Sequence, residues 1–114
     1  MLTVKALETF GADAAEGLAR CFGNEALYLR LVGTVPGEQN FARLQESVAA
    51  GDLAAGFEAA HALKGVLANL SLTPILRPVE EITELLRSGT QTDYTGLLGT
   101  VEEERRRLQE LCES

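Results

Sequence analysis

The sequence predicts an all-α protein: an antiparallel up-down four-helix bundle with a short N-terminal helical appendage. Three observations favour this fold class. Of the 114 residues, 46% are hydrophobic but only 5% are aromatic, with no tryptophan, a balance that favours an Ala/Leu helical core over a β-rich fold. Apolar residues recur at the helical period in several consecutive segments. Short turns join these segments, and such turns force neighbouring helices to lie antiparallel.

Residues 1–23 form the predicted appendage. A short apolar piece, Leu2 to Phe10, is broken at Gly11. Asp13 then opens a second helical piece that ends near Gly23. A chain of this length is sufficient for one domain, so we expect the appendage and the bundle to belong to a single domain.

Residues 24–114 form the predicted bundle. Asn24 is expected to cap its first helix, because the asparagine side chain accepts hydrogen bonds from the free backbone donors of the first turn. The helical period then continues to Ala50, with an interruption at Pro36 and Gly37. The segment is therefore either one kinked helix or two short ones.

The next helix is predicted to begin at a tight turn. Gly51 and Asp52 make that turn, and the aspartate caps a helix expected to run to about Leu72. Thr73 and Pro74 then supply an N-cap and a proline at the first helical position of the following helix.

Two further helices complete the bundle. Pro78 falls just after the first turn of one of them and is expected to bend its entry. Residues 88–92 form the last loop, and Asp93 is expected to cap the final helix. The predicted core stripes are Ile75, Val79, Ile82 and Leu86 in the first of these helices and Leu97, Val101, Leu108 and Leu111 in the second.

Charge argues against a nucleic acid as the partner. The formal net charge is −7, whereas phosphate backbones demand clustered Lys and Arg. The one basic run, Arg105–Arg107, directly follows Glu102–Glu104. We interpret these six residues as a solvated helix face with local ion pairs.

The chain carries no predicted membrane segment. No stretch approaches the roughly 20 apolar residues that span a bilayer, and residues 1–10 lack the apolar core of a signal peptide. Cys21 and Cys112 have no metal-ligand spacing and are expected to be free thiols in a reducing compartment. We therefore expect a cytoplasmic protein.

The helix that follows Asp52 carries the only histidine of the chain. On a helical wheel His61 lies about 160° from Leu63 and so faces outward. The opposite, apolar side gathers Leu53, Gly56, Ala59, Ala60, Leu63, Val66, Leu67 and Leu70. The face around His61 carries Ala54, Phe57, Lys64, Gly65 and Ala68. This face is built mainly of very small residues, which indicates that another surface comes close to the imidazole.

A neutral imidazole is a nitrogen nucleophile at physiological pH, because its reference pKa is about 6.5. It can take an activated phosphoryl group as a phosphoramidate. Lys64, one turn beyond His61, is placed to offset the charge of that group. Gly65 in mid-helix costs about 1 kcal/mol relative to alanine, and we interpret it as giving steric access to the histidine.

The segment from His61 to Leu72, HALKGVLANLSL, resembles the histidine-containing phosphotransfer (HPt) domain of multistep phosphorelays in two-component signalling. The approach to it, with Gly51 and Asp52, and the helix after it, with Glu80, fit the same family. The resemblance covers roughly residues 24–111.

The resemblance implies a four-helix bundle whose exposed His61 accepts a phosphoryl group at Nε2 from a receiver-domain aspartate and passes it to another receiver domain. Receiver domains of response regulators or hybrid histidine kinases are thus the expected partners of a monomer. The chain itself is expected to need no cofactor and no metal, because magnesium belongs to the receiver in this family. The chain is expected to be a phosphocarrier without autokinase activity, since it has no ATP-binding motif.

The resemblance also assigns roles around the histidine. Thr83 stands where the family often has a glutamine that orients the imidazole; threonine is shorter, which leaves a bridging water as the alternative to a direct bond. Ala68 flanks the site. Ser71 stands where the family often has glycine, and we expect this to affect only the turn. The residues expected to contact the partner are Ala54, Phe57, Glu58 and Asn69.

Two other functions fit less well. A helical adaptor that docks a response regulator without phosphotransfer is the main alternative, although the histidine, lysine and glycine of the motif are all present. Metal or haem binding in the bundle core requires Glu-x-x-His pairs on facing helices. Glu58 and His61 make one such spacing, and the chain has no second histidine.

Overall fold

The computed structural model describes residues 1–114 as an all-α protein, which confirms the predicted class. It contains seven α-helices and one 3₁₀ turn, and no strand. The elements are α1 (Val4–Phe10), α2 (Ala14–Arg20), α3 (Glu25–Thr34), η1 (Val35–Gly37), α4 (Asn40–Ala49), α5 (Leu53–Asn69), α6 (Thr73–Arg87) and α7 (Thr95–Glu113).

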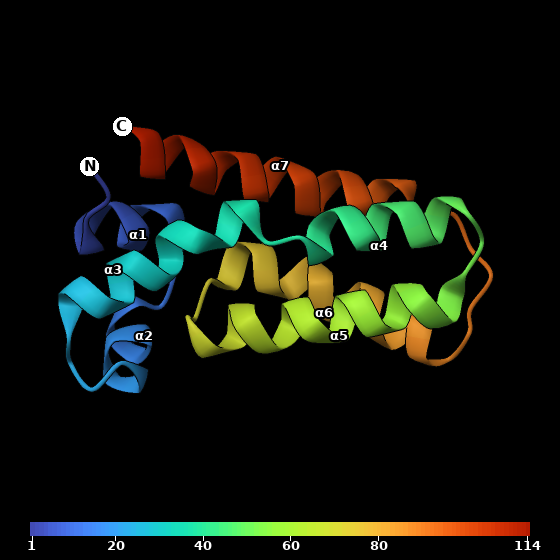
Figure 1. The fold of residues 1–114 in the computed structure, drawn as a ribbon, viewed down its shortest axis with the longest axis horizontal. Coiled ribbons are helices and arrows are strands. Elements are labelled where there is room, and N and C mark those ends of the chain that lie inside the picture. Colours follow the sequence, from blue (N-terminus) through green and yellow to red (C-terminus); the bar gives the residue numbers. More distant parts are fainter.

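The longer helices lie along the long axis of an elongated molecule of 41 × 25 × 19 Å (Figure 1). Helix α5 packs against α4 and α6, and α6 also packs against α7. Helices α1, α2 and α3 gather at one end, where both termini lie (Figure 1). The arrangement is compatible with a helical bundle. No helix combines the length and the apolar character needed to cross a membrane.

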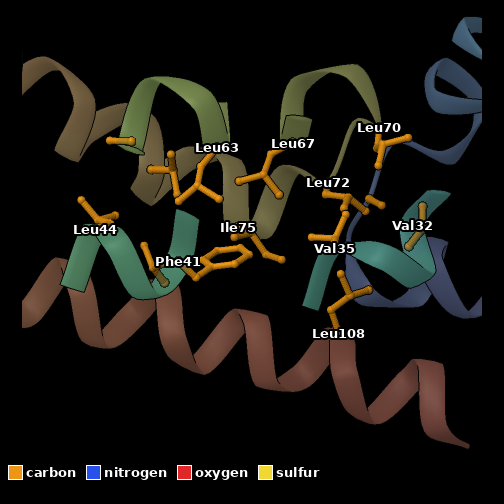
Figure 2. Packing of buried hydrophobic residues seen from close by; sticks show 14 of the residues in the cluster. Val32, Val35, Phe41, Leu44, Leu63, Leu67, Leu70, Leu72, Ile75 and Leu108 are labelled. Atoms are coloured by element: carbon orange, nitrogen blue, oxygen red, sulfur yellow. The ribbon is translucent and has the colours of Figure 1, made fainter. Parts of the chain in front are cut away.

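A single hydrophobic cluster runs through the whole chain. Side chains from α3, η1, α4, α5, α6 and α7 point into a common interior (Figure 2). The cluster also includes Leu7 and Phe10 of α1. The N-terminal helices therefore share their core with the rest of the chain.

Two of the predicted caps are confirmed. The Asn24 side chain accepts a hydrogen bond from the backbone N–H of Leu27 at 3.0 Å, and Asp52 accepts one from Ala55 at 3.0 Å. Residues 24–50 form two helices, α3 and α4, with the 3₁₀ turn between them, so the second of the two predicted alternatives is correct.

The end of α5 differs from the prediction. The helix ends at Asn69, three residues before Leu72, because Ser71 adopts a left-handed conformation with φ of 55°. The N–H of Ser71 bonds to the Ala68 carbonyl, and that of Leu72 bonds to Leu67. This is a Schellman ending with serine at the position that glycine usually takes. The Ser71 hydroxyl also bonds to Glu16 at 3.0 Å, so its effect reaches beyond the turn.

The predicted start of α6 is wrong by one residue. Thr73 is the first helical residue, and Leu72 is the N-cap, without a side-chain cap bond. The N–H of Leu72 also bonds to the Leu67 carbonyl in the Schellman ending of α5. Leu72 therefore takes part both in the end of α5 and in the start of α6. Pro74 lies in the first turn of the helix, as expected, and Pro78 lies inside it.

The final helix also begins one residue later than predicted. Tyr94 is its N-cap, and its ring is buried at 4% exposure. Asp93 accepts a hydrogen bond from the N–H of Thr95 at 2.9 Å, which forms a turn ahead of the helix. The α6 core stripe is confirmed in full. In α7 the buried positions include Leu98, which the predicted stripe left out, while Leu97 and Leu111 are only half-buried.

The predicted ion pairs and the predicted free thiols are both confirmed. Arg105, Arg106 and Arg107 each pair with the glutamate three residues earlier on α7. Both cysteines are free thiols, with Cys21 buried and Cys112 half-buried.

Candidate functional site

His61 lies on the exposed face of α5, as the helical wheel predicts. Its neighbour Leu63 points to the opposite side and is fully buried. The burial of Ala59, Ala60 and Leu67 on that same side fixes the rotation of α5 about its axis. The packing of the helix therefore determines that His61 lies on the outer face of α5.

The imidazole of His61 stacks on the ring of Phe57, one turn earlier on α5. The ring centroids are 5.6 Å apart and the planes differ by 22°, an offset-stacked geometry that aromatic pairs favour. The guanidinium carbon of Arg87, in the last turn of α6, lies 5.0 Å from the centroid of the same Phe57 ring. Phe57 thus lies in contact with both an imidazole and a cation.

Two cations and one carboxylate lie near this stack. Arg87 donates from Nε to Oε2 of Glu84 at 2.9 Å. This hydrogen bond and the charge of Arg87 lower the pKa of the Glu84 carboxyl, and the charge of Lys64 adds a smaller effect in the same direction. Lys64 is half-buried and forms no ion pair. Its ammonium group remains available to a further anion.

Gly65 is exposed, and a methyl group built on its Cα would meet no atom within 4 Å. Packing inside the chain therefore does not require glycine at this position. Ala54 is exposed and Ala68 is half-buried on the same face, and Glu58 and Asn69 are exposed at its edges. Ala54, Gly65 and Ala68 therefore project little from the surface around the imidazole.

Thr83 does not reach His61. It is fully buried, and its hydroxyl donates to the Val79 carbonyl of its own helix at 2.6 Å. The imidazole of His61 takes part in no hydrogen bond with any protein group. A direct bond from Thr83 to the imidazole is therefore absent.

Two hollows of the surface lie away from the His61 imidazole itself. One of about 510 Å³ adjoins Phe57 and is also lined by Leu53, Leu86 and Arg87. A larger groove of about 1020 Å³ runs between α4 and α7 and includes no residue of the His61 face. No group of three or more His, Cys, Asp or Glu side chains is close enough to hold a metal ion.

Sequence reasoning missed Glu84 and Arg87. Both lie on α6, which packs alongside α5. The predicted antiparallel pairing of these two helices could have indicated that the end of α6 lies beside the start of α5. Which α6 residues face Phe57 depends on the rotation of α6, and the wheel of α5 does not contain that information.

Comparison with known proteins gives one match. A family model described as the Hpt domain matches residues 37–113, which include η1 in part and all of α4 to α7. No curated protein and no solved structure gives a significant match to the chain.

Proposed function

The chain belongs to the Hpt-domain family, whose members serve phosphotransfer in phosphorelays, and on that basis we propose that His61 accepts a phosphoryl group from a receiver-domain aspartate and passes it to another receiver domain. The partners are receiver domains of response regulators or hybrid histidine kinases. The chain acts as a phosphocarrier and has no autokinase activity. Within this proposal it is a cytoplasmic monomer.

The proposed reaction is a displacement at phosphorus. The Nε2 lone pair of a neutral His61 attacks the phosphorus of the donor aspartyl phosphate, while Nδ1 keeps its proton. The N–P bond forms as the P–O bond to the donor carboxylate breaks, and the bonding pair leaves with that carboxylate. The reverse displacement on a second aspartate returns the free imidazole. The chain needs no cofactor of its own in this scheme, and Mg²⁺ is held by the receiver.

The observation that carries the proposal is the open space above Gly65. An exposed mid-helix glycine costs about 1 kcal/mol relative to alanine, and no neighbour within the chain requires it. Transfer between a histidine and an aspartate demands in-line approach of a whole second protein surface. A glycine one turn from His61, with Ala68 beside it, leaves room for that approach.

Charge supports the same role. The phosphoryl group adds negative charge to the His61 face, and Lys64 is one turn away without an anionic partner. A charge-assisted hydrogen bond from lysine is stronger than a neutral one. We therefore propose that Lys64 offsets the phosphoryl charge.

The proposed fold holds these residues on one face of a helix. We propose that α3 with α4, followed by α5, α6 and α7, form the antiparallel up-down four-helix bundle of the family. In this assignment residues 1–23 are a helical appendage to a single domain. No observation favours the adaptor alternative over phosphotransfer.

The decisive experiment is phosphoryl transfer from a labelled, phosphorylated receiver domain to this protein, with His61→Gln beside the wild type. We expect an acid-labile, base-stable label on the wild type alone. Circular dichroism on both proteins serves as the folding control. The absence of label from any of several receivers, with both proteins folded, would replace phosphotransfer by the adaptor function.

A further inference from the structure

The imidazole of His61 stacks on Phe57 and forms no hydrogen bond or ion pair within the chain. No protein group forms a hydrogen bond with either ring nitrogen. The fully buried Thr83, at the position from which the next helix was expected to orient the histidine, bonds to Val79 instead. An exposed histidine side chain without such a partner is free to exchange among its rotamers. The ring of Phe57, with its centroid 5.6 Å away, limits that exchange.

Phe57 is itself held in place. It is half-buried against the start of the helix, and it lines a hollow together with Leu86 of α6. The Arg87 guanidinium lies over its ring at 5.0 Å, and Glu84 fixes Arg87 through a hydrogen bond of 2.9 Å. A cation over the face of an aromatic ring is attracted to it by about 0.5–1 kcal/mol at an exposed site. Residues of α6 therefore contact the Phe57 ring, and the Phe57 ring in turn contacts the imidazole.

We propose that Phe57 is a positioning residue for phosphotransfer, which holds the imidazole of His61 by stacking in the absence of a hydrogen bond from the neighbouring helix. The inference rests on the proposed function. It differs from the sequence-based prediction that Phe57 contacts the partner, because a positioning residue changes the transfer step and a contact residue changes binding.

The expected size of the effect follows from counting conformers. In a helix, a side chain has about two accessible χ1 wells, and χ2 of histidine is roughly two-fold. A freely moving imidazole therefore spends about a quarter of its time in any one orientation. Loss of the stack should slow transfer about fourfold at saturating receiver, with little change in the receiver concentration that gives half the maximal rate.

The test compares three variants with the wild type. Phe57→Leu removes the flat ring but keeps an apolar side chain, and Phe57→Tyr keeps the ring. Phe22→Leu is the matched control, because Phe22 lies in the turn after α2 and is 95% exposed. For each protein we would measure the transfer rate from a phosphorylated receiver over a range of receiver concentrations.

The second readout is proton NMR of the imidazole in the unphosphorylated protein. The chain has a single histidine, so its ring protons need no further assignment. In the wild type we expect ring-current shifts and cross-relaxation with the Phe57 ring. Phe57→Leu should abolish both and average the side-chain couplings, while Phe57→Tyr and Phe22→Leu should retain the wild-type ordering and rate.

Three outcomes would overturn the inference. A Phe57→Leu protein with an unchanged maximal rate and a raised half-saturation concentration would make Phe57 a docking contact. If the side-chain couplings of His61 in Phe57→Leu equal those of the wild type, the stack does not order the ring. If both proteins take the label and the Phe57→Leu variant transfers with wild-type kinetics, this inference is wrong and the proposed function stands. If the wild type takes no label, the proposed function itself is wrong.

Discussion

Gly17 of α2 lies directly against the ring of Tyr28 in α3. A methyl group placed on the Gly17 Cα would lie 2.5 Å from Cε1 of the tyrosine and 2.6 Å from its hydroxyl oxygen, well inside van der Waals contact. The ring has no room to retreat, because Tyr28 is fully buried and its hydroxyl donates to the Leu70 carbonyl at 2.9 Å. This contact joins α2 and α3 to the end of α5.

Gly17→Ala should therefore destabilise the protein. Overpacking a core position typically costs about 1–3 kcal/mol, and we expect a loss of that size in the free energy of unfolding from urea titration. Gly33→Ala is the matched control, because Gly33 lies in α3 with no atom within 4 Å of an added methyl group. A Gly17→Ala protein as stable as the control would show that the Tyr28 ring moves freely.

Gly65→Ala should have opposite effects on stability and on transfer. The substitution meets open space in an exposed helix, so we expect a gain of about 0.5–1 kcal/mol in unfolding free energy. The added methyl group lies on the face around His61 where we propose that the receiver docks, so transfer from a phosphorylated receiver should slow. Gly65→Gln should nearly abolish transfer with the fold intact, and a wild-type rate in that variant would contradict the docking argument.

Lys64→Ala should slow phosphoryl transfer or shorten the lifetime of phosphohistidine. Exposed ion pairs contribute about 0.2–1 kcal/mol, so the expected change is at most about fivefold. Lys64→Arg keeps the positive charge and serves as the control. Rates and lifetimes equal to the wild type in the alanine variant would remove Lys64 from the charge role.

Alkaline pH should destabilise the protein through Tyr28. Burial, with smaller contributions from the charges of Cys21 and Asp13, raises the pKa of Tyr28 from 10.0 to about 12. The stability that this proton contributes is fully present below pH 10 and is lost as the pH rises towards 12, because the unfolded chain has by then released a proton that the native state still holds.

The measurement is the free energy of unfolding as a function of pH across that range, together with a tyrosinate absorbance titration. Tyr28→Phe should flatten the alkaline decline. Tyr94→Phe should retain the part of the decline due to Tyr28, although burial also raises the pKa of Tyr94. A native protein whose Tyr28 titrates near its ordinary value would contradict the prediction.

Local chemistry made part of the fold predictable. The caps at Asn24 and Asp52 act on the backbone three residues away, so the sequence nearby contains all that determines them. The outward direction of His61 follows from a period of apolar residues that extends over the whole of α5. For both kinds of feature, the interacting groups lie on one helix.

Features that depend on distant residues were not predictable in the same way. Ser71 accepts a left-handed backbone where its carbonyl takes a hydrogen bond from the N–H of Asp13 at 3.0 Å and its hydroxyl bonds to Glu16. The contact of Arg87 with Phe57 depends on how α6 is rotated against α5. The resemblance to the family indicated Thr83 as the residue next to His61 on the following helix. It could not show that the Thr83 hydroxyl bonds to its own backbone.

The region that the family model matches begins at Gly37, but the hydrogen bonds at the end of α5 come from residues before it. Tyr28 and Asp13 supply the donors for the carbonyls of Leu70 and Ser71. A fragment cut at the family boundary would leave both carbonyls without these donors at the C-terminal end of the histidine helix. Any transplant of this helix into a fusion protein or a synthetic signalling circuit must therefore carry Asp13 and Tyr28 with it, and so α2 and α3.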